Sequence, residues 1–490
     1  MALLTKSKYI AGLQCPKLLW FLINDKGKVP EPLREAQYRM DVGTEVGVLA
    51  IKLFPGGVSI PTNDFKANLN ITKENLSKNM PLFEAGILAN NCFSRIDILK
   101  PNKDGSFDII EVKSGTKVKE ENIHDVSFQK YCCEMAGLKI ARCSLCFINN
   151  QYVREKELNI NELFTIQDIT AEVVQAQQGI QERIDEFFNI IKSPNLPSVS
   201  IGRHCNSPYS CNLMDECWGF LPKNNVFTLY MGGKKSIELF SKDIHSIADI
   251  PDDFKLTNNQ GIQRKCEQTG EVHIQPFEIK QFLNTLIYPL YHLDFETFSP
   301  AIPRYDYSRP YQKIPFQFSL HIEQEDGSTE HISFLAEGKE DPRPAFLARL
   351  KEVMGTQGSV VVYNQAFEKW VLNTLARDFP EYKGWVNEIL LRVADLLIPF
   401  RSFNYYHPSQ QGSASLKKVL PALTGESYEG MEIADGGDAS LRYEEITFGD
   451  IAEEERAKVR ENLEKYCELD TWAEVVIIRK LKEIVGNSNI

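Results

Sequence analysis

An acidic tetrapeptide at the end of an apolar run constrains this chain more than any other feature. The motif DFET occupies residues 294–297 and follows the apolar residues 286–293, which predict a buried strand. Side chains alternate between the two faces of a strand, so Asp294 and Glu296 share one face. Two converging carboxylates are costly unless a cation neutralises them, and oxygen ligands favour magnesium or manganese. We therefore expect a divalent-metal site at the end of this strand.

Two later segments supply further polar groups. Tyr466 and Asp470 are four residues apart in the apolar-periodic segment 459–481, so they share one face of a predicted helix. Residues 360–368 predict a buried strand that runs into the motif Asn-x-x-Phe-Glu, which ends at Glu368. A metal site could therefore draw ligands from three separate parts of the chain.

These motifs, in this order, resemble the DxE, Asn-x-x-Phe-Asp and Tyr-x3-Asp motifs of the DEDD exonucleases, which have an RNase H-like fold. The resemblance implies a pair of metal ions that clamp a scissile phosphate, with Tyr466 orienting the attacking water. Glu368 stands where that family usually has aspartate, and Asp395 is the rival for the third ligand. The implied metal ligands are Asp294, Glu296, Asp470 and either Glu368 or Asp395. Lysines in the segment 412–418 are expected either to contact phosphate or to lie on a solvated helix face.

A second group of charged residues lies in the N-terminal half. Asp97 is followed by a turn and by a strand predicted over residues 107–113. The alternation of that strand places Glu111 and Lys113 on one face. A glutamate near a lysine is common on exposed strands, so this pair becomes informative only together with Asp97 and the helix that follows.

A helix predicted over residues 123–136 carries Gln129 on its apolar face. A buried amide must find partners, because leaving it unpaired costs about 1–3 kcal/mol. Asp97, the Glu-x-Lys strand and this glutamine together resemble the core of the RecB-type PD-(D/E)XK nucleases. The resemblance implies that Asp97 and Glu111 bind a divalent metal, and that Lys113 positions water or stabilises the developing charge on phosphorus.

Four cysteines bracket this N-terminal half, one early and three late in a Cys-x5-Cys-x5-Cys pattern. The four are Cys15, Cys205, Cys211 and Cys217. They resemble the cysteines of iron-sulfur RecB-type nucleases, such as the AddB nuclease domain and CRISPR-associated adaptation nucleases, which implies one [4Fe-4S] cluster. Zinc is the structural alternative, although its ligand pairs are usually only about two to four residues apart. Cys143 and Cys146 fall in a predicted strand that points them to opposite faces, so we expect both in the core.

Length and composition favour an intracellular enzyme with several domains. The chain has 490 residues, 11 cysteines and a formal net charge of -12. The cysteines lack the regularity of a short disulfide scaffold, and no signal peptide or membrane span is evident, so a cytoplasmic location is expected. The negative charge argues against extended nonspecific binding to nucleic acid, although carboxylate-rich metal sites supply part of it.

The motifs predict an α/β chain with two catalytic domains. Residues 1–222 would form an iron-sulfur PD-(D/E)XK domain of the restriction-endonuclease-like class, and residues 288–490 an RNase H-like α/β domain. Residues 223–287 would form a small helical linker module, in which residues 241–250 are expected to be a short helix.

The expected function is that of a metal-dependent nuclease, and in particular an exonuclease, with two active sites. It would act on DNA in repair, recombination or defence, with nucleic acid as its main partner and repair or defence proteins as further partners. Intact acids at both sites favour an enzyme. The alternatives are a nucleic-acid-binding or scaffold protein with one or both sites vestigial, and an RNA 3′–5′ exonuclease.

Overall fold

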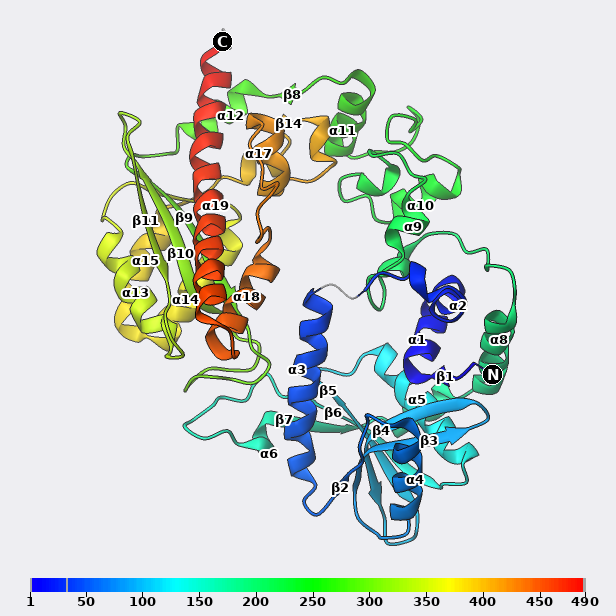
Figure 1. Ribbon diagram of the computed structural model, residues 1–490. Coiled ribbons are helices and arrows are strands. Elements are labelled where there is room, and N and C mark those ends of the chain that lie inside the picture. The colour runs from blue at the N-terminus through cyan, green and yellow to red at the C-terminus, as the bar shows by residue number, and fades with distance from the viewer. Residues whose placement is uncertain (1, 32–33, 488–490) are drawn as a thin grey trace. The chain divides into compact units, whose positions relative to one another are not determined.

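The computed structural model describes residues 2–31 and 34–487 and contains two compact units (Figure 1). The first unit comprises Met1–Gly219 and Pro300–Tyr311, and the second comprises Phe220–Ser299 and Gln312–Ile490. The segment 223–287, expected as a separate linker module, is part of the second unit. Within the described residues, no helix has the length and apolar character needed to cross a membrane.

The first unit is built on a seven-stranded mixed sheet. Its strands are β1 (Leu4–Thr5), β2 (Val58–Ser59), β3 (Leu82–Ala89), β4 (Cys92–Pro101), β5 (Phe107–Lys113), β6 (Ile140–Ile148) and β7 (Phe164–Asp168). Strands β2 to β7 lie side by side in sequence order, and β1 pairs with β4 outside that path. Strand β4 runs antiparallel to β3 and β5, whereas β5 and β6 run parallel. The strand expected over residues 107–113 is confirmed as β5.

The helices of the first unit are α1 (Lys6–Gln14), α2 (Pro16–Asn24), α3 (Arg34–Ala50), α4 (Phe65–Asn75), α5 (Glu120–Met135), α6 (Ile160–Leu163), α7 (Thr170–Ala176), α8 (Ile180–Lys192) and α9 (Met214–Trp218). Helices α3 and α5 cover opposite faces of the sheet. One apolar cluster joins Ile109 and Cys143 to α5, and a second joins Ile110 and Cys146 to α3. The opposite placement of Cys143 and Cys146 in the core is thereby confirmed. Because Glu111 shares a face with Ile109, it points towards α5.

A segment from later in the chain completes the first unit. The guanidinium of Arg154 donates hydrogen bonds to the backbone carbonyls of Pro303, at 2.9 Å, and Arg304, at 2.7 Å. In return, the backbone N–H of Tyr307 donates to the carbonyl of Arg154 at 2.8 Å. The first unit is therefore assembled from two separate stretches of sequence.

The second unit contains a five-stranded mixed sheet. Its strands are β9 (Leu290–Phe298), β10 (Ile314–Glu323), β11 (Thr329–Leu335), β12 (Ser359–Val362) and β13 (Val393–Asp395), and a separate pair is formed by β8 (His273–Ile274) and β14 (Tyr405–Tyr406). The five strands follow the order β11-β10-β9-β12-β13. The central strand β9 runs antiparallel to β10 and parallel to β12. Both units are thus mixed α/β structures, as the sequence predicted.

The helices of the second unit are α10 (Lys234–Ser241), α11 (Asn258–Thr269), α12 (Pro276–Leu283), α13 (Pro342–Val353), α14 (Gln365–Asp378), α15 (Lys383–Leu391), α16 (Ile398–Arg401), α17 (Leu416–Thr424), α18 (Gly436–Phe448) and α19 (Glu453–Asn487). The helix expected over residues 459–481 is confirmed within the longer α19. The expected short helix over residues 241–250 is wrong, since this segment forms turns after α10. Asp243 has a φ of 61°, a left-handed conformation that a right-handed helix cannot contain.

The two faces of the second sheet differ in character. One face packs apolar residues, among them Leu293, Phe295 and Phe318, against α13, α14 and α15 (Figure 1). The alternation along β9 places Asp294 and Glu296 on the opposite face. Helices α18 and α19 pack on β9 there, so the polar face is also covered. The expected division of side chains between the two faces is confirmed, although the strand begins at Leu290 rather than at residue 286.

Candidate active sites

Three carboxylates converge where β9 packs against α19. Asp294 and Glu296 come from β9, and Asp470 comes from the middle of α19. One carboxylate oxygen from each of the three lies within 4.8 Å of the other two. Glu296 and Asp470 are each only 7% exposed, so water screens their charges poorly. The structure thus brings together acids that are as many as 176 positions apart, since 470 minus 294 is 176.

This crowding raises the pKa values of all three acids. Burial, followed by the charges of Asp470 and Glu296, raises the pKa of Asp294 well above its usual range. Burial and the charge of Asp470 raise the pKa of Glu296 to about 8. Burial raises the pKa of Asp470 to about 6, although a hydrogen bond from Tyr428 acts in the opposite direction. A cluster of this kind is stabilised either by protonation or by a bound cation.

Glu368, in the first turn of α14, belongs to the same electrostatic group. Burial raises its pKa to about 8, and its own charge helps to raise the pKa of Asp294. Its Oε2 atom is buried and has no hydrogen-bond partner among the described residues. Asp395 differs, because its Oδ1 accepts the backbone N–H groups of Asn364 and Leu397, both at 3.0 Å. Glu368 therefore has an oxygen free of hydrogen bonds among the described residues, although it lies outside the group of three acids whose oxygens are within 4.8 Å of one another. Asp395 instead fixes the turns after β12 and β13, and the third ligand stays a prediction.

Two residues that the sequence did not single out also reach the acids. The hydroxyl of Tyr428 donates a 2.5 Å hydrogen bond to Asp470 Oδ1. Glu474 lies one helical turn beyond Asp470, is 1% exposed, and has a pKa raised by burial and by the charges of Asp294 and Glu368. The i, i+4 spacing from Asp470 is a signal that could have identified Glu474. Nothing in the spacing of Tyr428 points to this site.

Tyr466 and Lys417 lie beside the same acids. Tyr466 is 4% exposed, and its side chain lies close enough to Asp470 to act against the rise in the pKa of that carboxyl. The ammonium of Lys417, from the segment 412–418, lies 5.3 Å from the ring centre of Tyr466 and 5.6 Å from that of Tyr428. Its charge lowers the pKa values of both Glu296 and Asp470. Contact of the lysines in this segment with phosphate stays a prediction.

The acid cluster fits a hard divalent cation. Magnesium binds oxygen at about 2.0–2.1 Å in octahedral geometry, so its ligand atoms lie roughly 3–4 Å from one another. The oxygens of Asp294, Glu296 and Asp470 span a comparable distance, within 4.8 Å. The buried and unpaired Oε2 of Glu368 is a further donor without a partner of its own. Asp294, Glu296 and Asp470 would hold the metal, and Glu368 is a candidate for a further ligand.

Glu111 is the centre of a second charged network, in the first unit. It is 1% exposed, and its Oε1 and Oε2 atoms accept hydrogen bonds of 2.6 Å from Lys113 Nζ and Gln129 Nε2, respectively. Asp97 Oδ2 accepts the backbone N–H of Val112 at 2.8 Å, which holds Asp97 next to β5. The structure therefore brings the four residues predicted for this site together.

Lys6, at the start of α1, and Asp125, on α5, complete this network. Lys6 Nζ lies 2.9 Å from Glu111 Oε1 and 3.7 Å from Asp97 Oδ1, so it bridges the two predicted metal ligands. Asp125 Oδ2 accepts a 2.7 Å hydrogen bond from Lys113. Burial acts to lower the pKa of Lys6, but the nearby carboxylates outweigh it and raise that pKa above its ordinary value.

The sequence signals for these two residues differ. Asp125 lies four positions before Gln129 on the same helix, and that spacing could have identified it. Lys6 is 105 positions from Glu111, and no local pattern connects them. The two lysines offset part of the charge of the three carboxylates here. A metal ion held by Asp97 and Glu111 would therefore have to displace the ammonium of Lys6 from between them.

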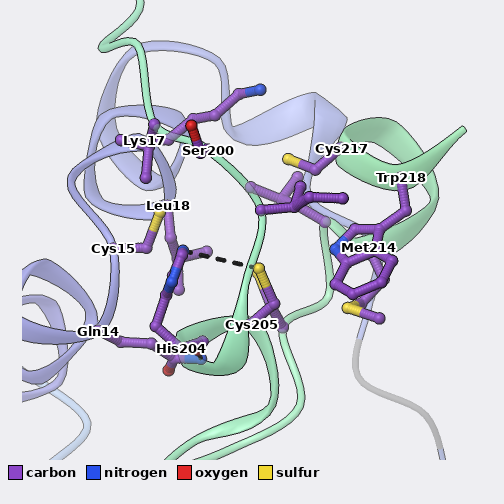
Figure 2. Close-up of a pocket in the computed structure, with 14 residues that line it drawn as sticks. Gln14, Cys15, Lys17, Leu18, Ser200, His204, Cys205, Met214, Cys217 and Trp218 are labelled. Carbon is purple, nitrogen blue, oxygen red and sulfur yellow. Dashed lines mark hydrogen bonds between the residues drawn. The ribbon is translucent and has the colours of Figure 1, made fainter. Parts of the chain in front are cut away.

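The four predicted cysteines line one pocket (Figure 2). They are Cys15, Cys205, Cys211 and Cys217. Cys15 precedes α2, and burial raises the pKa of its thiol, although the backbone N–H groups of Leu18 and Lys17 act in the opposite direction. Leu18, Met214 and Trp218 are among the side chains that surround the thiols. The ends of the first 219 residues thus meet at a thiol-lined site in a largely apolar setting.

The spacing of the sulfur atoms bears on the zinc alternative. A tetrahedral zinc ion with Zn–S bonds of about 2.3 Å places its sulfurs about 3.8 Å apart. Within the part of the chain that the structure describes, no three cysteine sulfurs lie within 4.8 Å of one another. The four thiols therefore lack the close spacing of a zinc site. A [4Fe-4S] cluster, in which each thiolate binds a different iron atom, stays a prediction.

Comparison with known proteins identifies one matching family model. A model described as a domain of unknown function (DUF2779) matches residues 291–415, a segment that contains Asp294, Glu296, Glu368 and Asp395 but ends before Tyr466 and Asp470. The chain is also similar to the "Uncharacterized protein MG366 homolog" of Mycoplasma pneumoniae, with 28% identity over 219 residues. That match covers 40% of this chain and 32% of the relative, so the chain spans about a third of the relative's length.

Proposed function

We propose that this protein is a metal-dependent nuclease with two active sites that hydrolyses phosphodiester bonds in DNA. The observation that carries the proposal is the convergence of Asp294, Glu296 and Asp470, whose oxygens lie within 4.8 Å of one another. Burial and mutual repulsion make this cluster unfavourable as bare anions, so the fold maintains an arrangement that a divalent cation would stabilise. Structural cores rarely retain such a group without a ligand for it.

The chemistry at the second unit follows from the residues around these acids. Magnesium or manganese, when bound, supplies the positive charge that stabilises the attacking and leaving oxygens in phosphodiester hydrolysis. Asp294, Glu296, Asp470 and Glu368 would hold it. The hydroxyl of Tyr466 would orient the attacking water. Lys417 would attract the phosphate, because its positive charge lies close enough to act on Glu296 and Asp470.

The sheet order supports an RNase H-like architecture for this unit. Its first three strands form an antiparallel series, β9 to β11, and the next two, β12 and β13, add parallel to the other edge of β9. The acids then lie on the central strand and on the helix that covers it. A DEDD exonuclease places its metal ligands on these elements, which is the reason for preferring exonuclease activity here.

The first unit supports a second nuclease site of the PD-(D/E)XK class. Asp97 and Glu111 would hold the metal, Lys113 would stabilise the charge that develops on the phosphate, and Gln129 would fix the position of Glu111. The neighbouring cysteines support an iron-sulfur cluster as a structural element. The four thiols come from opposite ends of the first 219 residues, and binding to one cluster would join those ends.

Cleavage assays on the full chain test both sites together. Anaerobically purified protein would be incubated with end-labelled single- and double-stranded DNA and RNA, with magnesium or manganese. We expect DNA cleavage by the wild type, partial loss in Asp294→Asn and in Glu111→Gln, and complete loss in the double variant. Glu464→Gln, at an exposed position of α19, is the matched control and should cleave as the wild type does.

The outcomes separate the alternatives. Preferential cleavage of RNA would replace the DNA assignment with an RNA exonuclease. Binding of nucleic acid without cleavage by the wild type, with either metal, would reject the nuclease and leave a binding or scaffold protein. Equal activity of the double variant and the wild type would show that neither acid site carries the cleavage.

A further inference from the structure

A second group of metal-binding side chains lies on the same sheet, outside the acid cluster. His321 on β10 and His331 on β11 are direct cross-strand partners, and Glu468 faces them from α19. One ligand atom from each of the three lies within 4.8 Å of the other two. The rings stack with their centres 4.5 Å apart. Three rigid elements therefore hold two imidazoles and one carboxylate together.

Hydroxyl groups fix the orientation of both imidazoles. His331 Nε2 lies 2.9 Å from Ser319 Oγ, and His321 Nδ1 lies 2.8 Å from Thr471 Oγ1. The two hydroxyl oxygens are 2.7 Å apart, and Thr471 Oγ1 also donates to the backbone carbonyl of Glu468 at 3.1 Å. Metal-binding histidines commonly have their second nitrogen held in this way.

Each hydroxyl in this chain can accept a hydrogen bond from the imidazole beside it. In the tautomer in which both rings donate their N–H to these hydroxyls, His321 Nε2 and His331 Nδ1 carry lone pairs, the form that coordinates a metal.

The remaining donor lies next to one of these lone pairs. Glu468 Oε1 is 3.7 Å from His331 Nδ1, the nitrogen that the hydroxyl chain does not use. Two imidazoles and one carboxylate form a donor set typical of zinc, and unlike the all-oxygen sets that magnesium prefers.

We propose that His321, His331 and Glu468 bind one divalent transition-metal ion of the zinc type. Three protein ligands leave a fourth position for water. The ion would fasten α19 to β10 and β11, and α19 carries Tyr466 and Asp470. This site uses none of the residues assigned to the nuclease reaction, so it can be tested independently of the proposed function.

Zinc content measures this site directly. The full chain would be equilibrated with zinc in the presence of excess magnesium, which competes for oxygen sites, then freed of unbound metal and analysed for zinc per chain. We expect His331→Asn and Glu468→Gln each to lose about one zinc equivalent relative to the wild type. Glu330→Gln, one position before His331 on β11 and exposed, is the matched control and should lose none.

A second readout separates this site from the cysteines, which can also take up zinc. The X-ray absorption spectrum of bound zinc should lose nitrogen and oxygen ligation in His331→Asn, with sulfur ligation unchanged. Zinc should raise the melting temperature of the wild type more than that of either variant. If circular dichroism shows that His331→Asn does not fold, the zinc content of Glu468→Gln, a change at an exposed position, tests the proposal by itself. Equal zinc content in the wild type and Glu468→Gln would overturn the proposal.

Discussion

The ammonium of Lys6 lies 2.9 Å from Glu111 Oε1, so the first helix of the chain supplies a cation to the central acid of β5. The same oxygen also accepts a hydrogen bond from Lys113 at 2.6 Å. Two lysines therefore share one carboxylate oxygen, and the charge that a metal would bring to this site is already partly present.

Removing Lys6 should make metal binding at the first site easier. In an Asp294→Asn background, which isolates the first site, Lys6→Met should lower the manganese concentration for half-maximal cleavage by roughly tenfold, or about 1.4 kcal/mol of charge repulsion. Lys73→Met, at an exposed position of α4, is the control. A higher manganese requirement in Lys6→Met would mean that Lys6 helps to build the site rather than competing for it.

Asp294→Asn should act on the rate of cleavage at the second site. In a background with Glu111→Gln, we expect kcat to fall on the order of 100-fold or more, with a smaller change in substrate affinity, because a ligand needed by the transition state is lost. Tyr466→Phe should cost less, since only the orientation of water is affected. Single-turnover kinetics measure the rate of cleavage separately from the affinity for substrate. A rate unchanged by Asp294→Asn would leave this unit as a binding platform.

The choice between Glu368 and Asp395 can be made by comparing activity with stability. Glu368→Gln should abolish second-site cleavage without lowering the melting temperature, because Glu368 Oε2 has no partner to lose. Asp395→Ala should instead destabilise the protein by about 1–3 kcal/mol, because two buried backbone N–H groups lose their acceptor. Denaturant unfolding and cleavage assays on both variants provide the test. The reverse pattern would make Asp395 the ligand.

The buried acids should make the metal-free protein less stable as the pH rises. The pKa values of Glu296 and Glu368 are raised from 4.5 to about 8, so the folded state binds more protons than the unfolded state between these limits. Stability contributed by these groups is then present near pH 4.5 and lost as the pH approaches 8.

Melting temperatures measured from pH 5 to pH 8 test whether stability falls as the pH rises. Without divalent metal the melting temperature should fall with rising pH, and magnesium should reduce that fall by binding the ionised carboxylates. Glu296→Gln should reduce the fall in the metal-free protein as well. A metal-free protein whose stability is independent of pH in both wild type and variant would contradict the raised pKa values.

Cys15→Ala should remove iron and stability together. Anaerobic wild-type protein is expected to be brown and to contain iron and sulfide in a ratio that fits one [4Fe-4S] cluster, and the variant should be colourless and melt at a lower temperature. Cys266→Ala, a buried cysteine outside the pocket, serves as the control. Stoichiometric zinc, with no iron or sulfide, would identify the site as a zinc site.

Local patterns in the sequence predicted the strands and helices that carry the sites. Alternation placed Glu111 and Lys113 together on β5, and the i, i+4 rule placed Tyr466 and Asp470 on one face of α19. What the sequence could not provide were partners fixed only by tertiary packing. Lys6 and Tyr428 reach their carboxylates from distant segments with no recognisable spacing, and the turn at Asp243 replaced an expected helix because one residue adopts a left-handed backbone. The roles assigned to the acids and the cysteines stay predictions.

The return of residues 300–311 to the first unit has a consequence for synthesis. Arg154 bonds to the carbonyls of Pro303 and Arg304, so the first unit lacks these partners until the ribosome has made them. By then β9, which belongs to the second unit, has already been translated. Folding of the two units is therefore interleaved during translation rather than sequential. A fragment cut after Gly219 would leave the Arg154 guanidinium without these acceptors, so an isolated first unit should be produced with residues 300–311 attached through a short linker.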